Sequence, residues 1–252
     1  MKLQIVVASS FFIFSCAVGG NLFNPLCVSD SKKDGAAISI GGAYDSDHFS
    51  YNLKNGAIHE QKNNPLCLLL SMYTSTYVSD AIDVGVEFTV KFPKKVAGKA
   101  LSAAYKEYND KLTSAGAEKN AADAKNANEP YRIEINQQMS TSVLLRCGYY
   151  LENIDAVLFA GVGVSFSKVK FSIAGKAKTN SNADVMICNK EISNTVPVFA
   201  FGISKSVSRK SSVKLQYTMQ MSKTNSFDDD IHVTHHLKYK NNSIALTFVH
   251  YL

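Results

Sequence analysis

The sequence has no tryptophan, few charged residues and no long apolar run beyond its first twenty positions. Of its 252 residues 19% are charged, below the roughly 25% of an ordinary soluble domain. Without another run of about 18 apolar residues, a polytopic helical membrane protein is excluded. Aliphatic and aromatic residues are too numerous for a disordered chain. The formal net charge of +6 is spread over the chain without any nucleic-acid-binding motif, so we expect no nucleic acid partner.

Motifs of enzymes and cofactor-binding proteins are also missing. The sequence has no G-x-S-x-G, H-E-x-x-H, P-loop or dinucleotide-binding fingerprint, each of which places reactive or ligand-binding groups at a fixed spacing. We therefore expect a protein without enzymatic activity, cofactor or bound metal ion.

The N-terminus predicts export. Lys2 precedes a mostly apolar segment and small residues follow, which is the pattern of a secretory signal peptide. Residues 13–16 also resemble a bacterial lipobox, so lipidation of Cys16 is an alternative to its removal with the signal. The chain is thus predicted to consist of a signal peptide, a periplasmic N-terminal segment and one folded domain, at residues 1–19, 20–35 and 36–252.

Apolar and polar residues alternate along most of the exported chain. In residues 84–92, five apolar residues are separated by Gly85, Glu87, Thr89 and Lys91. This period of two predicts a β-strand with one apolar and one polar face. Eight such strands are expected, at residues 36–44, 66–78, 84–92, 131–150, 158–167, 199–204, 213–221 and 243–248.

The connections between the expected strands alternate in length. Short turns at one end and long loops at the other are typical of an up-and-down transmembrane β-barrel, and ring closure leaves no backbone unpaired in lipid. The predicted fold is therefore all-β, an eight-stranded antiparallel up-and-down transmembrane β-barrel with long outer loops. The short turns are expected at 79–82, 151–155 and 208–211, and the long loops at 45–65, 93–130, 172–194 and 222–242.

The alternation does not say which face lies inside. A soluble, lipocalin-like periplasmic barrel would enclose an apolar ligand, whereas an outer-membrane barrel turns its apolar face to lipid. The Gly- and Ser-rich polar face of 156–167 and the charges in mid-strand favour the membrane barrel. Charges inside a narrow lumen must pair or meet water, so we expect salt bridges that plug the lumen, with a small diffusion pore as the alternative. The expected lumen charges are Glu87, Lys91, Arg146 and Lys214.

Five segments carry a family resemblance: Leu145-Arg146-Cys147-Gly148-Tyr149, Ala160 to Ser165, Phe199 to Ser204, Val213 to Tyr217 and Asn242 to Phe248. Together they resemble the eight-stranded outer-membrane β-barrel family, which includes the OmpA membrane domain, opacity proteins and bacterial surface antigens. The resemblance implies a place in the bacterial outer membrane, contact with its lipid, and a structural role in the cell envelope. It also implies adhesion or contact with a host or partner protein through loops exposed at the cell surface. Such chains usually end in an aromatic residue, whereas this one ends in Leu252.

One of the expected outer loops has a helical pattern. Alanine dominates residues 94–128, and apolar residues recur there at spacings of four, three and four. This stripe would either pack on a neighbouring loop or dock a host or partner protein. Its residues are Leu101, Tyr105, Tyr108 and Leu112.

Four cysteines remain after export: Cys27, Cys67, Cys147 and Cys188. A disulfide needs Cα atoms within about 7 Å, so it cannot cross a hydrocarbon layer of about 30 Å. The predicted topology therefore allows a Cys67–Cys188 disulfide at the outer rim and a Cys27–Cys147 disulfide at the periplasmic rim. Free thiols are the alternative, in which case Cys147 would face lipid.

Overall fold

The computed structural model describes residues 35–53, 58–100, 127–177, 184–228 and 234–252. Among these residues, no helix is long and apolar enough to cross a membrane. The predicted signal peptide with Cys16, and the stripe Leu101, Tyr105, Tyr108 and Leu112, lie outside them.

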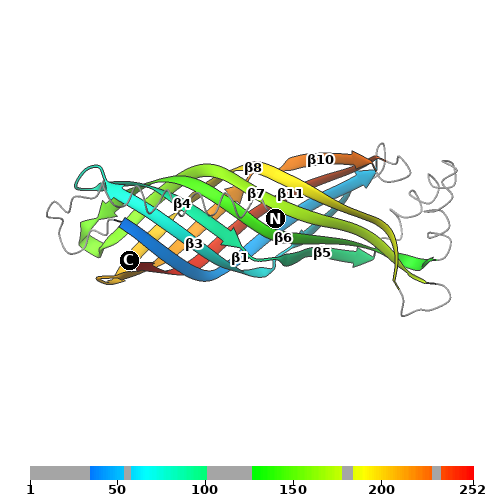
Figure 1. Ribbon diagram of the computed structural model, residues 1–252, viewed down its shortest axis with the longest axis horizontal. Helices are drawn as coiled ribbons and strands as arrows, with labels where there is room; N and C mark the ends of the chain where they lie inside the picture. The colour runs from blue at the N-terminus through cyan, green and yellow to red at the C-terminus, as the bar shows by residue number, and fades with distance from the viewer. Residues whose placement is uncertain (1–34, 54–57, 101–126, 178–183, 229–233) are drawn as a thin grey trace.

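Eight long strands form a closed antiparallel ring (Figure 1). β11 pairs with β1 over a register that runs from Tyr251 opposite Ala37 to His235 opposite Leu53, and this pairing closes the ring. The predicted barrel and all eight predicted strands are confirmed. In ring order the strands are β1 (Gly35–Leu53), β3 (Leu66–Tyr77), β4 (Ile82–Lys91), β6 (Ala127–Leu151), β7 (Ala156–Ala177), β8 (Asp184–Ser208), β9 (Ser211–Gln220) and β11 (Thr234–Tyr251).

Three short strands continue the wall at one end: β2 (His59–Asn63), β5 (Lys94–Ala100) and β10 (Lys223–Asp228). They pair with β1, β6 and β11, respectively. Two residues separate each of them from β3, β4 or β9, and Pro65 and Pro93 lie in two of these interruptions. Proline interrupts a strand because it has no N–H to donate to the ladder.

The predicted short turns are confirmed, and all three lie at the end opposite to these short strands (Figure 1). The chain also ends there. The backbone N–H of Leu252 donates to the carbonyl of Ala36 at 3.0 Å, and that of Tyr251 donates to the carbonyl of Lys210 at 2.9 Å. This end is therefore closed by tight turns and by the C-terminal residues.

Strands replace much of the predicted loops 45–65, 172–194 and 222–242, whereas of the predicted loop 93–130 the structure describes only its ends, and 101–126 lies outside the described residues. β6 and β8 have 25 residues each and β7 has 22, whereas about 9–11 residues suffice to cross a bilayer. The strands therefore continue well beyond a membrane. The helix predicted over 94–128 is wrong at both of its ends, because Lys94–Ala100 is β5 and Ala127 and Asn128 begin β6.

The outer wall near the short turns is apolar. Val162 is 50% exposed and Leu246 is 58% exposed on this wall, while the residues between the wall positions point into the lumen. We call this apolar outer band the belt. Because the apolar side chains of the belt face outward, the alternative of a soluble barrel that encloses an apolar ligand is wrong. The belt includes Ile38, Ile40, Tyr44, Leu66, Leu68, Leu70, Ile82, Leu145, Tyr149, Leu158, Val162, Val164, Phe166, Phe199, Phe201, Leu215, Met219, Ile244, Leu246 and Phe248.

Beyond the belt the polarity of the two faces is exchanged. On β7, Val169 and Phe171 point inward and are fully buried, while Lys168 and Lys170 point outward. On β11, Leu237 and Tyr239 are buried, and the residues that alternate with them are lysines and a histidine. We call this part of the barrel the outer extension. Its inward residues include Phe49, Tyr51, Ile135, Val169, Phe171, Ile173, Ile192 and Leu237.

A bulge in β6 shifts one set of predicted side chains. The pairing of β6 with β7 is irregular between Gln137 and Ser140. Residues 135 and 137 point inward on one side of the bulge, and residues 140, 144 and 146 point inward on the other. Ile135 therefore points inward, whereas Met139 and Leu145, which strict alternation would put on the same face, point outward.

The exchange of polarity predicts that a lysine introduced on the outer wall destabilises the barrel in the belt but not in the outer extension. Val162→Lys places a charge on the belt and is expected to lower the free energy of unfolding by about 2–4 kcal/mol. Ser193→Lys, on the outward face of β8 in the outer extension, should leave it unchanged. Urea unfolding in lipid vesicles measures both variants, and equal effects would contradict the assignment of the belt to lipid.

Candidate functional site: two charge networks in the lumen

The inward face of the belt region carries a buried cluster centred on Glu87. Lys214 Nζ lies 2.7 Å from Glu87 Oε1, and Arg146 Nη1 lies 3.4 Å from Glu87 Oε2. The three side chains are at most 5% exposed. They come from β4, β6 and β9, and β4 and β9 are on opposite sides of the ring, so the Glu87–Lys214 pair spans the lumen.

Aromatic rings hold Arg146 in place. Its guanidinium carbon lies 4.1 Å from the centre of the Tyr73 ring and 3.9 Å from that of Phe159, close enough for cation–π attraction on both faces. The Tyr73 hydroxyl donates a hydrogen bond to Asp83 Oδ2. Glu87, Lys214, Arg146, Tyr73 and Asp83 form what we call the inner network, which fills the lumen on the side of the short turns.

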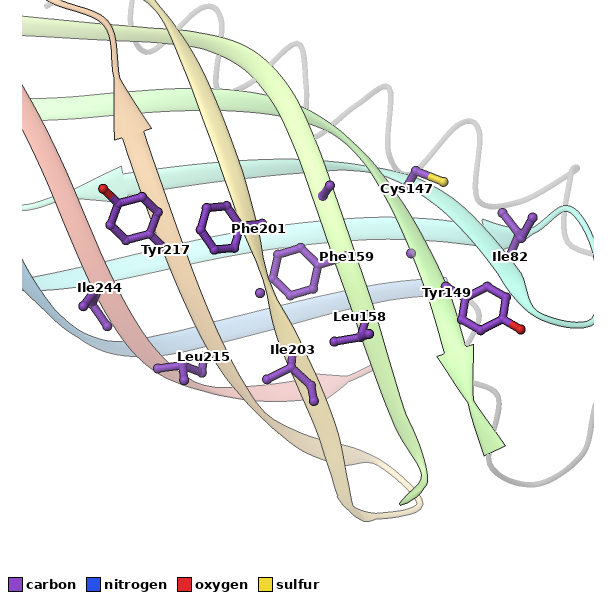
Figure 2. A pocket seen from close by; sticks show the side chains of 13 residues that line it. Ile82, Cys147, Tyr149, Leu158, Phe159, Phe201, Ile203, Leu215, Tyr217 and Ile244 are labelled. Atoms are coloured by element: carbon purple, nitrogen blue, oxygen red, sulfur yellow. The ribbon is translucent and has the colours of Figure 1, made fainter. Parts of the chain in front are cut away.

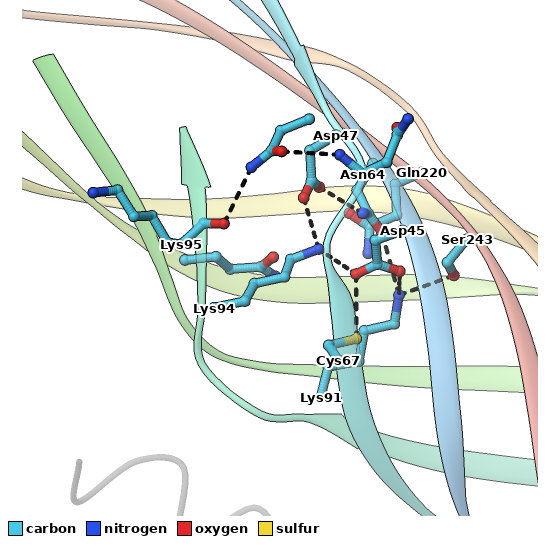
Figure 3. Close-up of polar contacts among 12 residues, drawn as sticks. Asp45, Asp47, Asn64, Cys67, Lys91, Lys94, Lys95, Gln220 and Ser243 are labelled. Carbon is cyan, nitrogen blue, oxygen red and sulfur yellow. Dashed lines mark hydrogen bonds and ion pairs between the residues drawn. The ribbon is translucent and has the colours of Figure 1, made fainter. Parts of the chain in front are cut away.

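A second cluster lies further out (Figure 3). Lys91 Nζ is 3.0 Å from Asp45 Oδ1, and Lys94 Nζ contacts Asp45 and lies 2.8 Å from Asp47 Oδ2. Both aspartate side chains are fully buried. Two carboxylates and two ammonium groups thus compensate one another inside the barrel, as buried charges must.

Neighbouring polar groups extend this cluster across the lumen. The Tyr239 hydroxyl lies 2.6 Å from Asp47 Oδ1 and 3.0 Å from Gln137 Oε1, and Asn241 Nδ2 donates to Asp47 Oδ1 at 2.7 Å. The Cys67 thiol donates to Asp45 Oδ2 at 3.3 Å. We call the group of Asp45, Asp47, Lys91, Lys94, Tyr239 and Asn241 the outer network.

Between the two networks the lumen contains a space of about 20 Å³, lined by serine, threonine and glutamine side chains. Such a space holds about one water molecule. Above the outer network, the extension is filled by aromatic rings: Tyr51 and Phe171 have centroids 5.3 Å apart, and Phe227 stacks on His235 at 5.0 Å. Side chains therefore occupy the interior at three successive levels.

The structure places all four predicted lumen charges inside the barrel. Glu87, Arg146 and Lys214 come together, and Lys91 belongs to the outer network. Sequence reasoning missed Asp45, Asp47, Lys94, Tyr239 and Asn241, because all five lie in segments predicted to be loops. Their alternation with outward residues was the signal that could have identified them. No group of three or more metal-binding side chains occurs within the part of the chain that the structure describes.

The Cys67–Cys188 disulfide is not formed, because Cys67 is a free thiol. Cys67 opens β3 and Cys188 lies in β8, four strands away in the eight-strand ring. Cys188 pairs with Ile173 in the outer extension, whereas Cys67 pairs with Ala43 at the level of the belt. Cys147 is also a free thiol, exposed on the outer wall, so its disulfide with Cys27, a residue outside the described ranges, is not formed either.

On the outer wall of the belt, near the short turns, there is an apolar groove of about 860 Å³ (Figure 2). Tyr149, Leu158, Phe201 and Leu215 line it, and Cys147 lies at its side. Its position on the belt makes it part of the lipid-facing surface.

A closed ring of eight antiparallel strands, apolar outside and charged inside, defines the architecture. The fold is that of the eight-stranded outer-membrane β-barrels. The structure of Ail, the attachment invasion locus protein of Yersinia pestis, is similar to this one. The alignment covers 86% of this chain and 99% of the Ail chain, at 12% sequence identity and a TM-score of 0.41. OprG of Pseudomonas aeruginosa matches 88% with 99% of its own, at 13% identity and a TM-score of 0.47. Neisserial surface protein A matches 87% with 100% of its own, at 9% identity and a TM-score of 0.38. No protein-family model and no curated protein sequence matches the chain.

The geometry of the inner network predicts that neutralising Glu87 strongly lowers the stability of the barrel. Glu87→Gln leaves Lys214 and Arg146 buried without their counter-charge, so the free energy of unfolding is expected to fall by about 3–5 kcal/mol. Urea unfolding in lipid vesicles measures the change.

The matched control is Glu191→Gln. Glu191 is exposed in the outer extension and accepts a hydrogen bond from Lys168 at 2.6 Å, which lowers the pKa of Glu191. Exposed pairs contribute little, so this variant should unfold like the parent protein. A similar loss in both variants would contradict the central role of Glu87.

Proposed function

We propose that the protein is a non-enzymatic surface protein of the bacterial outer membrane. In this proposal the belt anchors the barrel in lipid, while the outer extension and the loops above it stand outside the cell and contact a host or partner molecule. The short turns and the C-terminal residues face the periplasm, as in outer-membrane barrels generally.

The observation that supports this proposal best is the exchange of polarity along continuous strands. The belt has an apolar exterior, which suits lipid, and the outer extension has a polar exterior and an apolar core, which suit water. A barrel that served only as a membrane anchor would not need 25-residue strands. The extension holds the loops away from the membrane surface on a rigid support.

We propose further that the barrel does not conduct in its ground state. The inner network, the outer network and the aromatic core of the extension lie in series in one narrow lumen. The small diffusion pore remains the second candidate, and a pore would have to open all three levels. The absence of enzymatic activity is proposed on the sequence, which carries none of the hydrolase or metalloprotease motifs named above.

Single-residue labelling tests the orientation. Ser193→Cys, on the outward face of the extension, should react with a membrane-impermeant maleimide on intact cells, because it lies outside the cell in the proposal. Lys210→Cys, in the turn between β8 and β9, should react only after the outer membrane is permeabilised. The parent protein measures the background from its native cysteines. Labelling of the Lys210 variant on intact cells would reverse the proposed orientation.

Surface proteolysis of intact cells tests whether the loops are accessible. The segment 101–126 contains Lys106, Lys111, Lys119 and Lys125, so trypsin should cut there if this loop is exposed to a partner. Cells treated in this way should lose binding to the partner surface while the barrel stays in the membrane fraction. Retained binding after complete cleavage would place the contact elsewhere.

Planar-bilayer recording tests the closed lumen. The parent protein should show no steady conductance, and Glu87→Gln should show none either, because the outer network and the aromatic core still close the lumen. A steady current through the parent protein would favour the diffusion pore.

A further inference from the structure

The outer wall of the extension has a groove of about 490 Å³ across β10, β11, β1 and β2. These four strands are neighbours in the sheet, in that order. His48, Glu60, Thr224, His236, Lys238 and Lys240 are among the residues that line the groove. Glu60 is the one acid of this lining, and His48 Nε2 lies 3.6 Å from its carboxylate.

The cross-strand register places basic residues side by side at the edge of this groove nearest the belt. His48 pairs with Lys240 on one side and with Lys62 on the other. All three side chains point outward. Directly opposed side chains of an antiparallel pair have Cβ atoms about 5 Å apart. An anion bound over His48 would therefore have a lysine ammonium group on each side of it.

The next row outward supplies a further cation and hydroxyl groups. Lys238 pairs with Thr224 on β10 and with Ser50 on β1. Within the ranges that the structure describes, neither Lys238 nor Lys240 forms a salt bridge. Two ammonium groups and two hydroxyls are therefore available to a group that accepts several hydrogen bonds.

The height of the row relative to the belt identifies the source of the anion. Tyr44, Leu66 and Ile244 are exposed belt residues, and each lies four positions from His48, Lys62 or Lys240 on a continuous stretch of wall. Four residues rise about 13 Å along a strand, or about 10 Å along the membrane normal at the usual tilt. The head-group layer extends about 5–8 Å beyond the hydrocarbon, so the row lies just outside this layer, and lysine side chains can bend back into it.

We propose that this row, Lys62, His48 and Lys240 with Lys238 above it, binds a phosphate group on the head of an outer-leaflet lipid. The occupant is a membrane lipid because the acyl chains of a lipid so placed would lie on the belt directly below the row. The inference rests on the proposed orientation, in which the extension faces the outside of the cell. It goes beyond the proposed surface role because it assigns a lipid-binding site to the barrel wall itself.

The test uses the folded mature protein in a neutral detergent and a diphosphorylated lipid A as the probe, with bound lipid counted by native mass spectrometry. Lys62→Gln/Lys240→Gln is expected to weaken binding about 25-fold, since each lysine near an anionic lipid head group contributes about fivefold. The control Lys170→Gln/Lys190→Gln removes the same charge from exposed positions of the extension on β7 and β8 and should bind within twofold of the parent. All variants must show the parent's heat-dependent gel shift, which establishes folding.

Two further arms identify the ligand. Dephosphorylated lipid A should bind all variants weakly and equally. Inorganic phosphate, added as a competitor, should displace lipid A only at concentrations far above that of the lipid. Equal weakening in both double variants, or no preference for the phosphorylated lipid, would overturn the proposal, and displacement by phosphate at the lipid's own concentration would show a site for free anions.

These results are separable from the surface role. Membrane fractionation of cells and maleimide labelling report on the orientation, whereas lipid binding in detergent reports on the row alone. A correctly oriented protein that binds both lipids equally would overturn only the lipid site.

Discussion

The lumen of an eight-stranded barrel is too narrow to solvate a charge, and the rest of the structure follows from this constraint. Each ionised group inside must meet an opposite charge. Glu87 satisfies this with Lys214 from across the ring and Arg146 from the adjacent strand. Because the Glu87–Lys214 pair joins strands that are not hydrogen-bonded neighbours, it fixes the separation of opposite walls as well as the charge balance.

The same constraint explains why the barrel is built in two zones. Within the belt, the exterior must be apolar and the small interior is left to polar groups in pairs. Beyond the belt, water solvates the exterior, so the interior can be an ordinary apolar core of Tyr51, Phe171 and Leu237. The outer network lies at the boundary between the belt and the outer extension, and its carboxylates and ammonium groups separate the polar lumen from the aromatic core.

The strands and the short turns could be predicted from the sequence, because alternation is a local property, and the charges in mid-strand favoured an outward direction of the apolar face. Residues 84–92 show it most clearly, and Val84, Val86 and Phe88 lie on the outer wall as expected. The length of the strands could not be predicted as easily. In the segments taken for loops the alternation persists, but lysine and serine replace the apolar residues on the outside, so the belt pattern is absent there.

The partners of the lumen charges depend on the register, which is not local. Glu87 is 59 residues from Arg146 and 127 residues from Lys214. A single bulge between Gln137 and Ser140 turns the side chain of Ile135 from the outer wall to the lumen. No residue pattern in that segment predicts the bulge. The disulfide prediction failed for a related reason, since two cysteines assigned to the same rim lie at different heights on opposite walls.

The seam between β1 and β11 joins residues near the two ends of the described chain, with Ala37 opposite Tyr251. Local hairpins such as β6–β7 need only a turn of four residues to form, but the seam can form only after β11 has been translated. Joining segments so distant in sequence carries a large loop-closure entropy and is slow. Until β11 meets β1 the polypeptide is therefore an open sheet or an extended chain whose unpaired edges are prone to aggregate.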